Sequence, residues 1–205
     1  MTRTRIAVVS AGLSVPSSTR LLADRLAEAA QRSLRERGAD PVVDVIELRD
    51  HARDLANNLL TGFPAGELKT ALDTVVTADG LIAVTPVFNA SYSGLFKTFF
   101  DVVEADALSG MPVLLGATGG SARHSLVLEH AMRPMFAYLR SIVVPTAVYA
   151  ASEDWGGAGD ASGGLADRID RAAGELAGLA VGSGRSSRPD PYDEPTPFLD
   201  LLGGN

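Results

Sequence analysis

The sequence predicts an α/β protein built on one doubly wound parallel sheet with helices on both faces. Short apolar runs alternate five times with amphipathic segments of helical spacing, which is the pattern of a parallel sheet. Most of these runs are continuously apolar, as expected for strands that are covered on both faces. Three of them open into loops rich in glycine and hydroxyl residues. We therefore expect five strands in the order 2-1-3-4-5, with a ligand site at their carboxyl ends.

The N-terminal part of the chain supplies two of these strands. Residues 5–10 (RIAVVS) form a continuous apolar run that predicts a central strand. Leucine and alanine then recur at helical spacing until Gly38, which ends the helix. Residues 42–48 alternate and include two acidic residues, so this second strand is expected nearer an edge. A short helix with a loop is predicted at residues 50–63, and an amphipathic helix at residues 67–78.

The middle of the chain supplies the third and fourth strands. Residues 80–85 form the third strand, and we expect it to break at Pro86, because proline lacks the N–H that a central strand donates. An aromatic-rich segment from about Tyr92 to Glu104 predicts the next helix. Residues 111–117 (MPVLLGA) predict the fourth strand.

The C-terminal part completes the predicted fold. Residues 126–140 are helical in pattern, with a kink or break expected at Pro134. Residues 141–150 predict the fifth strand, interrupted by Pro145, and residues 165–181 predict a last amphipathic helix. The strands and helices therefore fill the chain nearly to its end.

The domain organisation follows from where this periodicity stops. We expect one domain over residues 1–182, because no composition break occurs within it. Residues 183–205 turn to glycine, serine, arginine and proline and lose periodicity. This pattern predicts an extended arm that lies against another subunit or a partner.

Composition excludes several classes of protein. The 205 residues carry a formal net charge of -7, which argues against nucleic acid or an anionic membrane as the main partner. The absence of cysteine excludes disulfides, thiolate catalysis and cysteine-ligated metals. No apolar run approaches the ~20 residues of a membrane span, and no signal segment is present, so we expect a cytoplasmic protein. The three histidines come without a carboxylate cluster, so no metal site is expected.

The loop after the first predicted strand carries clustered hydroxyls that lead into a helix. Ser17, Ser18 and Thr19 could hold a phosphate monoester through O–H and N–H donors and the helix dipole. They could equally serve only as helix caps. Arg20 adds positive charge nearby. The loop lacks both G-x-G-x-x-G and G-x-x-x-x-G-K-[ST], so a ligand with a single phosphate is expected rather than a dinucleotide or a nucleoside triphosphate.

Two further loops are expected beside the first, because strands one, three and four are neighbours in the predicted order. The loop TPVFNASYSG offers flat apolar surface and no acid, base or nucleophile at its centre. In the loop ATGGSARH, the Gly119-Gly120 pair either lets backbone approach the edge of a ring or forms a tight turn. The three loops together favour a ring system that brings its own chemistry.

Two weaker interpretations concern side chains near these loops. Arg123 and His124 are candidates for binding a second, anionic ligand at the rim. Ser91 and Ser93 suggest a nucleophile elbow, but the sequence lacks the first glycine of G-x-S-x-G. A hydrolase is therefore only a weak alternative. Phe96, Phe99 and Phe100 are expected in the core or at a subunit interface.

These motifs resemble those of the NADPH-dependent FMN reductase family of flavodoxin-like proteins. The resemblance covers roughly residues 5–181 and rests on SVPSSTR, on the glycine pair of ATGGSARH, and on TPVFNASYSGLFK. The last of these is close to the family pattern T-P-x-[YF]-N-x-S-x-x-G-x-x-K. Within the family, the chain is most similar to the actinobacterial reductases that supply reduced flavin to flavin-dependent monooxygenases.

The resemblance implies a role for each group of loop residues. The FMN phosphate would be held by four hydroxyl residues: Ser10, Ser17, Ser18 and Thr19. One side of the isoalloxazine and the ribityl chain would be lined by Pro86, Val87, Phe88, Asn89 and Ser91. The other edge of the ring would meet Thr118, Gly119, Gly120 and Ser121. The chain departs from the commoner pattern in having SAGLS in place of a G-S-x-R opening, and Phe88 where many relatives have tyrosine.

The activity implied by the resemblance is hydride transfer from NADPH, or NADH, to N5 of FMN, which then reduces a flavin or another small acceptor. A flavin-dependent monooxygenase is an implied partner, and a homodimer or homotetramer is expected. Two alternatives stay open. One is a quinone, azo or metal-oxyanion reductase on the same scaffold. The other is a flavodoxin-like electron carrier without pyridine-nucleotide activity.

Overall fold

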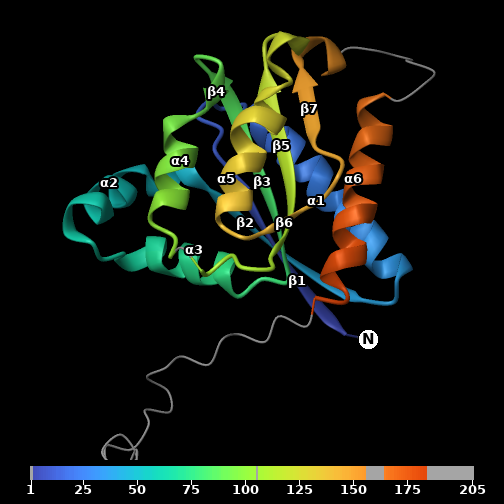
Figure 1. The fold of residues 1–205 in the computed structure, drawn as a ribbon, viewed down its shortest axis with the longest axis horizontal. Coiled ribbons are helices and arrows are strands. Elements are labelled where there is room, and N and C mark those ends of the chain that lie inside the picture. Colours follow the sequence, from blue (N-terminus) through green and yellow to red (C-terminus); the bar gives the residue numbers. More distant parts are fainter. Residues whose placement is uncertain (1, 105, 156–163, 184–205) are drawn as a thin grey trace, which may run out of the picture.

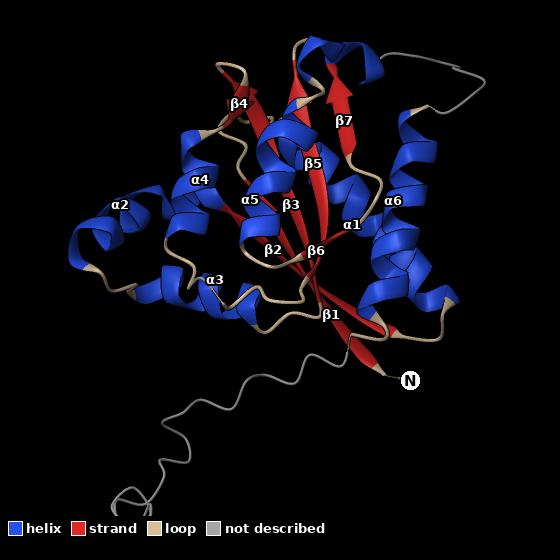
Figure 2. Ribbon diagram, viewed as in Figure 1, coloured by secondary structure: helices blue, strands red, loops and turns tan. Residues whose placement is uncertain are grey.

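A twisted sheet lies between two layers of helices in the computed structural model, which describes residues 2–104, 106–155 and 164–183 (Figures 1 and 2). The strands of the described residues are β1 (Arg3–Ser10), β2 (Asp40–Glu47), β3 (Gly80–Phe88), β4 (Ser91–Tyr92), β5 (Pro112–Gly119), β6 (Ile142–Val143) and β7 (Val148–Ala151). The α-helices are α1 (Ser18–Glu36), α2 (Ala52–Thr61), α3 (Gly66–Val76), α4 (Gly94–Asp101), α5 (Arg133–Tyr138) and α6 (Leu165–Ala180). Short helical turns are η1 (Leu48–His51), η2 (Ala122–His124), η3 (Leu128–Met132) and η4 (Ser152–Trp155).

The two faces of the sheet carry two separate apolar cores. Successive residues of a strand point to opposite faces, and β1 follows this rule with Ile6 and Val8 in one core and Ala7 and Val9 in the other. Helices α1 and α6 cover the first face, and α3, α4 and α5 cover the second (Figure 1). Burial on both faces favours apolar residues at successive positions, which explains the continuous apolar run of residues 6–9 in β1.

The predicted doubly wound parallel sheet is confirmed, but its description as five strands is wrong. The sheet has the order β2-β1-β3-β5-β6, with β7 also paired to β5 and β4 paired to β3, which makes seven strands in the described residues. The strands β6 and β7 are two pieces of the predicted fifth strand, and both run parallel to β5. The added strand β4 is antiparallel to β3 and closes a hairpin.

The fifth strand divides at Pro145, as the sequence predicts. Between β6 and β7, the N–H of Val144 still donates to the carbonyl of Val113 in β5 at 2.9 Å, and the backbone groups that follow find partners outside the sheet. Arg133 donates from Nη1 to the carbonyl of Val144 and from Nη2 to that of Pro145, each at 3.1 Å. The N–H of Thr146 donates to Glu175 Oε2 at 2.7 Å. Side chains of α5 and α6 therefore form hydrogen bonds with the backbone groups around Pro145 that no strand pairs with.

The third strand does not break at Pro86, contrary to the prediction. β3 continues to Phe88, and Pro86 pairs with Thr118 of β5. The carbonyl of Val84 accepts from the N–H of Ala11 at 2.9 Å, so the backbone groups of Val84 point toward the β1 side of the sheet. The backbone nitrogen of Pro86, two residues further along, points toward that same side. β1 has already ended at Ser10. The missing N–H of Pro86 therefore deprives no neighbouring strand of a donor.

Two helices differ from their predicted extents. The helix expected from Tyr92 begins instead at Gly94, because Tyr92 belongs to β4 and Ser93 caps the helix by accepting from the N–H of Phe96 at 3.2 Å. The segment predicted as a helix over residues 126–140 divides into η3, a turn of π-helix, and α5. Pro134 lies in the first turn of α5, directly after η3, so its missing N–H falls at the junction where the helix changes from π to α.

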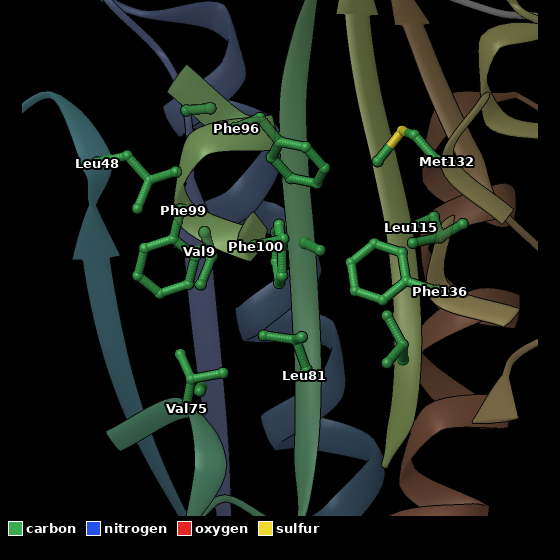
Figure 3. Packing of buried hydrophobic residues seen from close by; sticks show 14 of the residues in the cluster. Val9, Leu48, Val75, Leu81, Phe96, Phe99, Phe100, Leu115, Met132 and Phe136 are labelled. Carbon is green, nitrogen blue, oxygen red and sulfur yellow. The ribbon is translucent and has the colours of Figure 1, made fainter. Parts of the chain in front are cut away.

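The aromatic residues of α4 lie in the core rather than on the surface. Phe96, Phe99 and Phe100 are buried, and the ring of Phe100 lies 4.8 Å from that of Phe96 and 4.9 Å from that of Phe136, between centroids. Figure 3 shows these rings beside sheet residues such as Leu81 and Leu115. This arrangement confirms the core alternative for the three phenylalanines of α4.

The predicted arm lies outside the described residues, apart from Ser183. The last described element of the predicted domain is α6, which ends at Ala180. In the part of the chain that is described, no helix combines the length and the apolar character needed to cross a bilayer.

Candidate functional site

Three strands end side by side and bring their loops to one edge of the sheet. Ser10, the last residue of β1, pairs with Val84 of β3, and Pro86 of β3 pairs with Thr118 of β5. Because parallel strands place their carboxyl ends together, the loops that follow β1, β3 and β5 adjoin there. The structure thus brings together the three loops that the sequence singles out.

The hydroxyl residues of the first loop have different environments. Ser17 is the N-cap of α1, and its Oγ accepts from the N–H of Arg20 at 3.2 Å. Ser18 is exposed. Thr19 is only 2% exposed, and its Oγ1 lies 2.7 Å from Thr118 Oγ1. The capping interpretation therefore holds for Ser17, whereas Thr19 joins the first loop to the third.

Ser10 is the strongest sign that a polar ligand belongs at this edge. Its side chain is 1% exposed, and its Oγ has no hydrogen-bond partner within the described residues. A buried hydroxyl without a partner is costly, by about 1–3 kcal/mol. A ligand oxygen at the end of β1 would remove that cost.

The contact between Thr19 and Thr118 can be tested without a ligand. We expect Thr19→Val or Thr118→Val to lower the free energy of unfolding of the apoprotein by about 1–3 kcal/mol, because each change leaves the other buried hydroxyl unpaired. The double variant should cost less than the sum of the two single changes, since it removes both partners. Urea denaturation of the four proteins measures this coupling, and strictly additive costs would contradict it.

Arg20 does not present a free charge to the loop. Its Nε lies 2.8 Å from Asp24 Oδ1, and its Nη1 lies 2.5 Å from Glu47 Oε1. The hydrogen bond to Asp24 and the attraction of both carboxylates raise the pKa of Arg20 above its ordinary value. The predicted positive charge is therefore present, but two acidic side chains already neutralise it.

The second loop is a tight hairpin between β3 and β4. Val87 pairs with Tyr92 and Phe88 with Ser91, which leaves Asn89 and Ala90 as the two turn residues. Both have positive φ, of 48° and 67° respectively. Such a two-residue turn requires left-handed backbone, which asparagine tolerates better than alanine.

The side chains of this hairpin become more exposed to solvent toward its tip. Pro86, Val87 and Ser91 are half-buried, whereas Phe88 is 46% exposed and Asn89 is exposed at the tip. The flat side chain of Phe88 is thus the apolar surface that the loop offers to a ligand.

The two glycines of the third loop serve different purposes. A Cβ on Gly119 would lie 2.1 Å from Tyr149 Oη, so no larger residue fits beneath that hydroxyl. A Cβ on Gly120 would meet nothing within 4 Å. Close packing against Tyr149 therefore accounts for a glycine at position 119, and Gly120 faces open space where a ring could approach.

Tyr149 is a residue of this site that the sequence does not indicate. It lies in β7, is 4% exposed, and donates from Oη to the carbonyl of Ser121 at 2.9 Å. Burial raises the pKa of Tyr149 above its ordinary value, so the hydroxyl keeps its proton and its donor role at neutral pH. No motif or spacing links a tyrosine in the fifth strand to the loop after the fourth.

Arg123 and His124 lie in η2, directly after the glycine loop, and both are exposed. They remain candidates for contact with a second ligand. Among the described residues, no group of three histidine, aspartate or glutamate side chains could hold a metal ion.

Comparison with known proteins assigns the family. A family model described as NADPH-dependent FMN reductase matches residues 4–156. The chain belongs to the NADPH-dependent FMN reductase family.

Several FMN reductases and a solved structure are similar to this chain. An FMN reductase (NADPH) from Pseudomonas aeruginosa is 39% identical over 153 residues, which cover 74% of this chain and 78% of that protein. An NADH-dependent FMN reductase, SfnE, from Pseudomonas putida is 38% identical over 169 residues, or 82% of this chain and 88% of that protein. The structure of an oxidoreductase from Corynebacterium diphtheriae is 49% identical, with a TM-score of 0.84, and covers 88% of this chain and 98% of that one.

The described residues fit FMN. The N-terminus of α1, a helix of 19 residues, provides N–H groups and a dipole where the phosphate would lie. The unpartnered hydroxyl of Ser10 lies at the end of the neighbouring strand. Phe88 and Gly120 supply an exposed apolar side chain and open backbone for a flat ring.

Proposed function

We propose that this protein oxidises NADPH and reduces FMN, with the first loop holding the flavin phosphate and the other two loops holding the ring. The observation that carries the site assignment is the 2.7 Å contact between Thr19 and Thr118. It joins the loop suited to a phosphate to the loop suited to a ring edge. One ligand that carries both groups, such as FMN, spans the two loops.

Bound FMN supplies the chemistry, by accepting a hydride from the nicotinamide and passing electrons to an acceptor. The protein binds and orients it. Ser10, Ser18 and the N–H groups of α1 are proposed to bind the phosphate, with Ser17 and Thr19 holding the backbone of the loop. Phe88 and Gly120 are proposed to contact the ring, while Tyr149 fixes the carbonyl of Ser121 beneath it.

Anaerobic mixing of flavin-loaded protein with NADPH tests the function directly. We expect the absorption band of oxidised flavin to bleach, because the nicotinamide can stack on the exposed face of the ring. Alternating use of that face by donor and acceptor should also give parallel lines in double-reciprocal plots. If the band persists with both NADPH and NADH, the protein is an electron carrier instead. The relatives named above differ in their donor, so both donors are compared.

The acceptor is the finer part of the proposal. We propose that reduced flavin leaves the site and serves a flavin-dependent monooxygenase, which is consistent with a ring site bordered by exposed residues such as Phe88, Asn89 and Gly120. A quinone, azo dye or metal oxyanion is the alternative acceptor. Comparing NADPH oxidation with free FMN against oxidation with a quinone or azo dye, at equal acceptor concentration, distinguishes these cases.

The assembly and cellular location are also proposals. We propose a cytoplasmic homodimer or homotetramer in which a neighbouring subunit closes the flavin site. The phenylalanines of α4 are buried and cannot supply the interface, but Leu60, Phe63 and Tyr138 are largely exposed. Light scattering at micromolar concentration decides this point, and a monomer would rule the assembly out.

A further inference from the structure

Glu47 connects two arginines that lie on either side of the first loop. It is the last residue of β2 and pairs with Ser10 in the sheet. Its Oε1 accepts from Arg20 Nη1 at 2.5 Å, and its Oε2 lies 2.9 Å from Arg49 Nη2. The Glu47 side chain is 19% exposed, so water screens these contacts less than it screens surface ion pairs.

The two arginines hold the two ends of the loop. Arg49 donates from Nη1 to the carbonyl of Ser14 at 3.3 Å, near the start of the loop. Arg20 follows Thr19 directly, and its backbone N–H donates to the cap residue Ser17. Residues 14–20 are therefore held at both ends near the carboxyl end of β2: Glu47 contacts Arg20 directly, and it also contacts Arg49, which holds the carbonyl of Ser14.

The arginine side chains are engaged by protein groups rather than left open to a ligand. Arg20 also contacts Asp24 at 2.8 Å, and Arg49 also contacts Asp50 at 3.6 Å. Their effect on a phosphate therefore passes through the backbone of the loop. A loop fixed beforehand loses less conformational freedom when the ligand binds, which raises affinity.

We propose that Glu47 is a positioning residue which, through Arg20 and Arg49, sets how much more tightly the protein binds FMN than riboflavin. The inference rests on the proposed FMN reductase function. It concerns the phosphate alone, because riboflavin carries the same ring and ribityl chain without that group. Glu47 acts on the part of the site that only FMN uses.

The variant Glu47→Gln tests the proposal, because the proposal and simple charge repulsion predict opposite changes in FMN affinity. Removing a carboxylate close to a phosphate dianion would raise FMN affinity if simple repulsion dominated. Loss of the bridge should instead raise the Kd of FMN by about three- to tenfold, the range expected when charge-assisted contacts of this exposure are lost. The Kd of riboflavin should stay unchanged. Both are measured by quenching of flavin fluorescence on the purified protein.

Other variants separate the bridge from general effects. Arg49→Ala should also raise the Kd of FMN and should leave the Kd of riboflavin unchanged. Asp170→Asn is the matched control, because Asp170 forms an exposed ion pair with Arg32 at 2.8 Å between α6 and α1. It removes one carboxylate in the same way and should change neither affinity. Thermal unfolding of each apoprotein checks that the fold is intact.

Each outcome decides the proposal. Unchanged or tighter FMN binding in Glu47→Gln overturns it, and so does an equal loss of affinity for FMN and riboflavin. A wild-type protein that binds FMN no better than riboflavin refutes the phosphate site of the proposed function, and the bridge with it. A wild-type protein that prefers FMN, combined with an unaffected Glu47→Gln variant, refutes the bridge alone.

Discussion

Phe96→Ala should lower the free energy of unfolding by about 3–5 kcal/mol, the usual cost of removing a fully buried aromatic ring. Phe96 is completely buried, and its ring contacts those of Tyr92, Phe100 and Phe136. Alanine would leave a cavity that these rings cannot close without losing their own contacts. Urea denaturation of the apoprotein, followed by circular dichroism, gives the value.

Phe88→Ala is the matched control, because it removes the same ring from an exposed position. Phe88 is 46% exposed on the hairpin between β3 and β4. We expect its loss to change stability by less than about 0.5 kcal/mol. If it lines the ring of FMN, flavin affinity should fall by about 0.5–1.5 kcal/mol, the usual value of an aromatic pair. A large stability loss in Phe88→Ala, or none in Phe96→Ala, would contradict the packing described here.

Gly119→Ala should lower the stability of the apoprotein by about 1–3 kcal/mol, the range for an overpacked interior. Its Cβ would lie 2.1 Å from Tyr149 Oη, and that ring is fixed by burial and by its bond to Ser121. The ring must shift, and the carbonyl of Ser121 loses its donor. We therefore expect lower FMN occupancy as well as a lower midpoint of thermal unfolding.

Two comparisons isolate this clash. In Gly119→Ala combined with Tyr149→Phe, the nearest remaining atom is Tyr149 Cζ at 3.2 Å, so part of the lost stability should return. Gly120→Val should leave apoprotein stability nearly unchanged, because its Cβ meets open space. It should lower FMN occupancy, since the added side chain enters the region proposed for the ring. Equal loss of stability in both glycine variants would contradict the different roles assigned to them.

The sequence predicts most of the fold because burial repeats along it with a regular period. β1 and α6 lie close to their predicted positions, since continuous and helical apolar patterns report burial directly. The hairpin strand β4 is not predicted, because a strand of two residues is too short to show a periodic pattern of apolar residues. The extension of β3 past Pro86 is not predicted, because it depends on where the neighbouring strand β1 ends. That position is set by the tertiary structure and not by the local sequence.

The candidate site is predicted only where it lies on strand ends. The three loops are found because each follows a buried strand, and parallel order then places them together. The supporting residues Tyr149, Glu47 and Arg49 reach the loops from other strands and turns. No spacing in the sequence connects them to their targets. The close approach of Tyr149 to Gly119 is not predicted for the same reason, because nothing in the sequence shows that the two residues are neighbours.

The position of β2 at the border of the sheet has a consequence for aggregation. Within the described residues β2 pairs only with β1, so its other edge leaves backbone N–H and C=O groups without a strand. A groove of about 460 Å³ runs along it, and Val45 is partly exposed there. Such an edge invites strand addition by a second chain unless charges oppose it. Asp44 and Glu47 line this groove together with Arg20, and both carboxylates form ion pairs, Asp44 with Arg5 and Glu47 with Arg20 and Arg49. The ion pairs that hold the first loop thus also place charged side chains along the free edge of β2, a feature that disfavours strand addition.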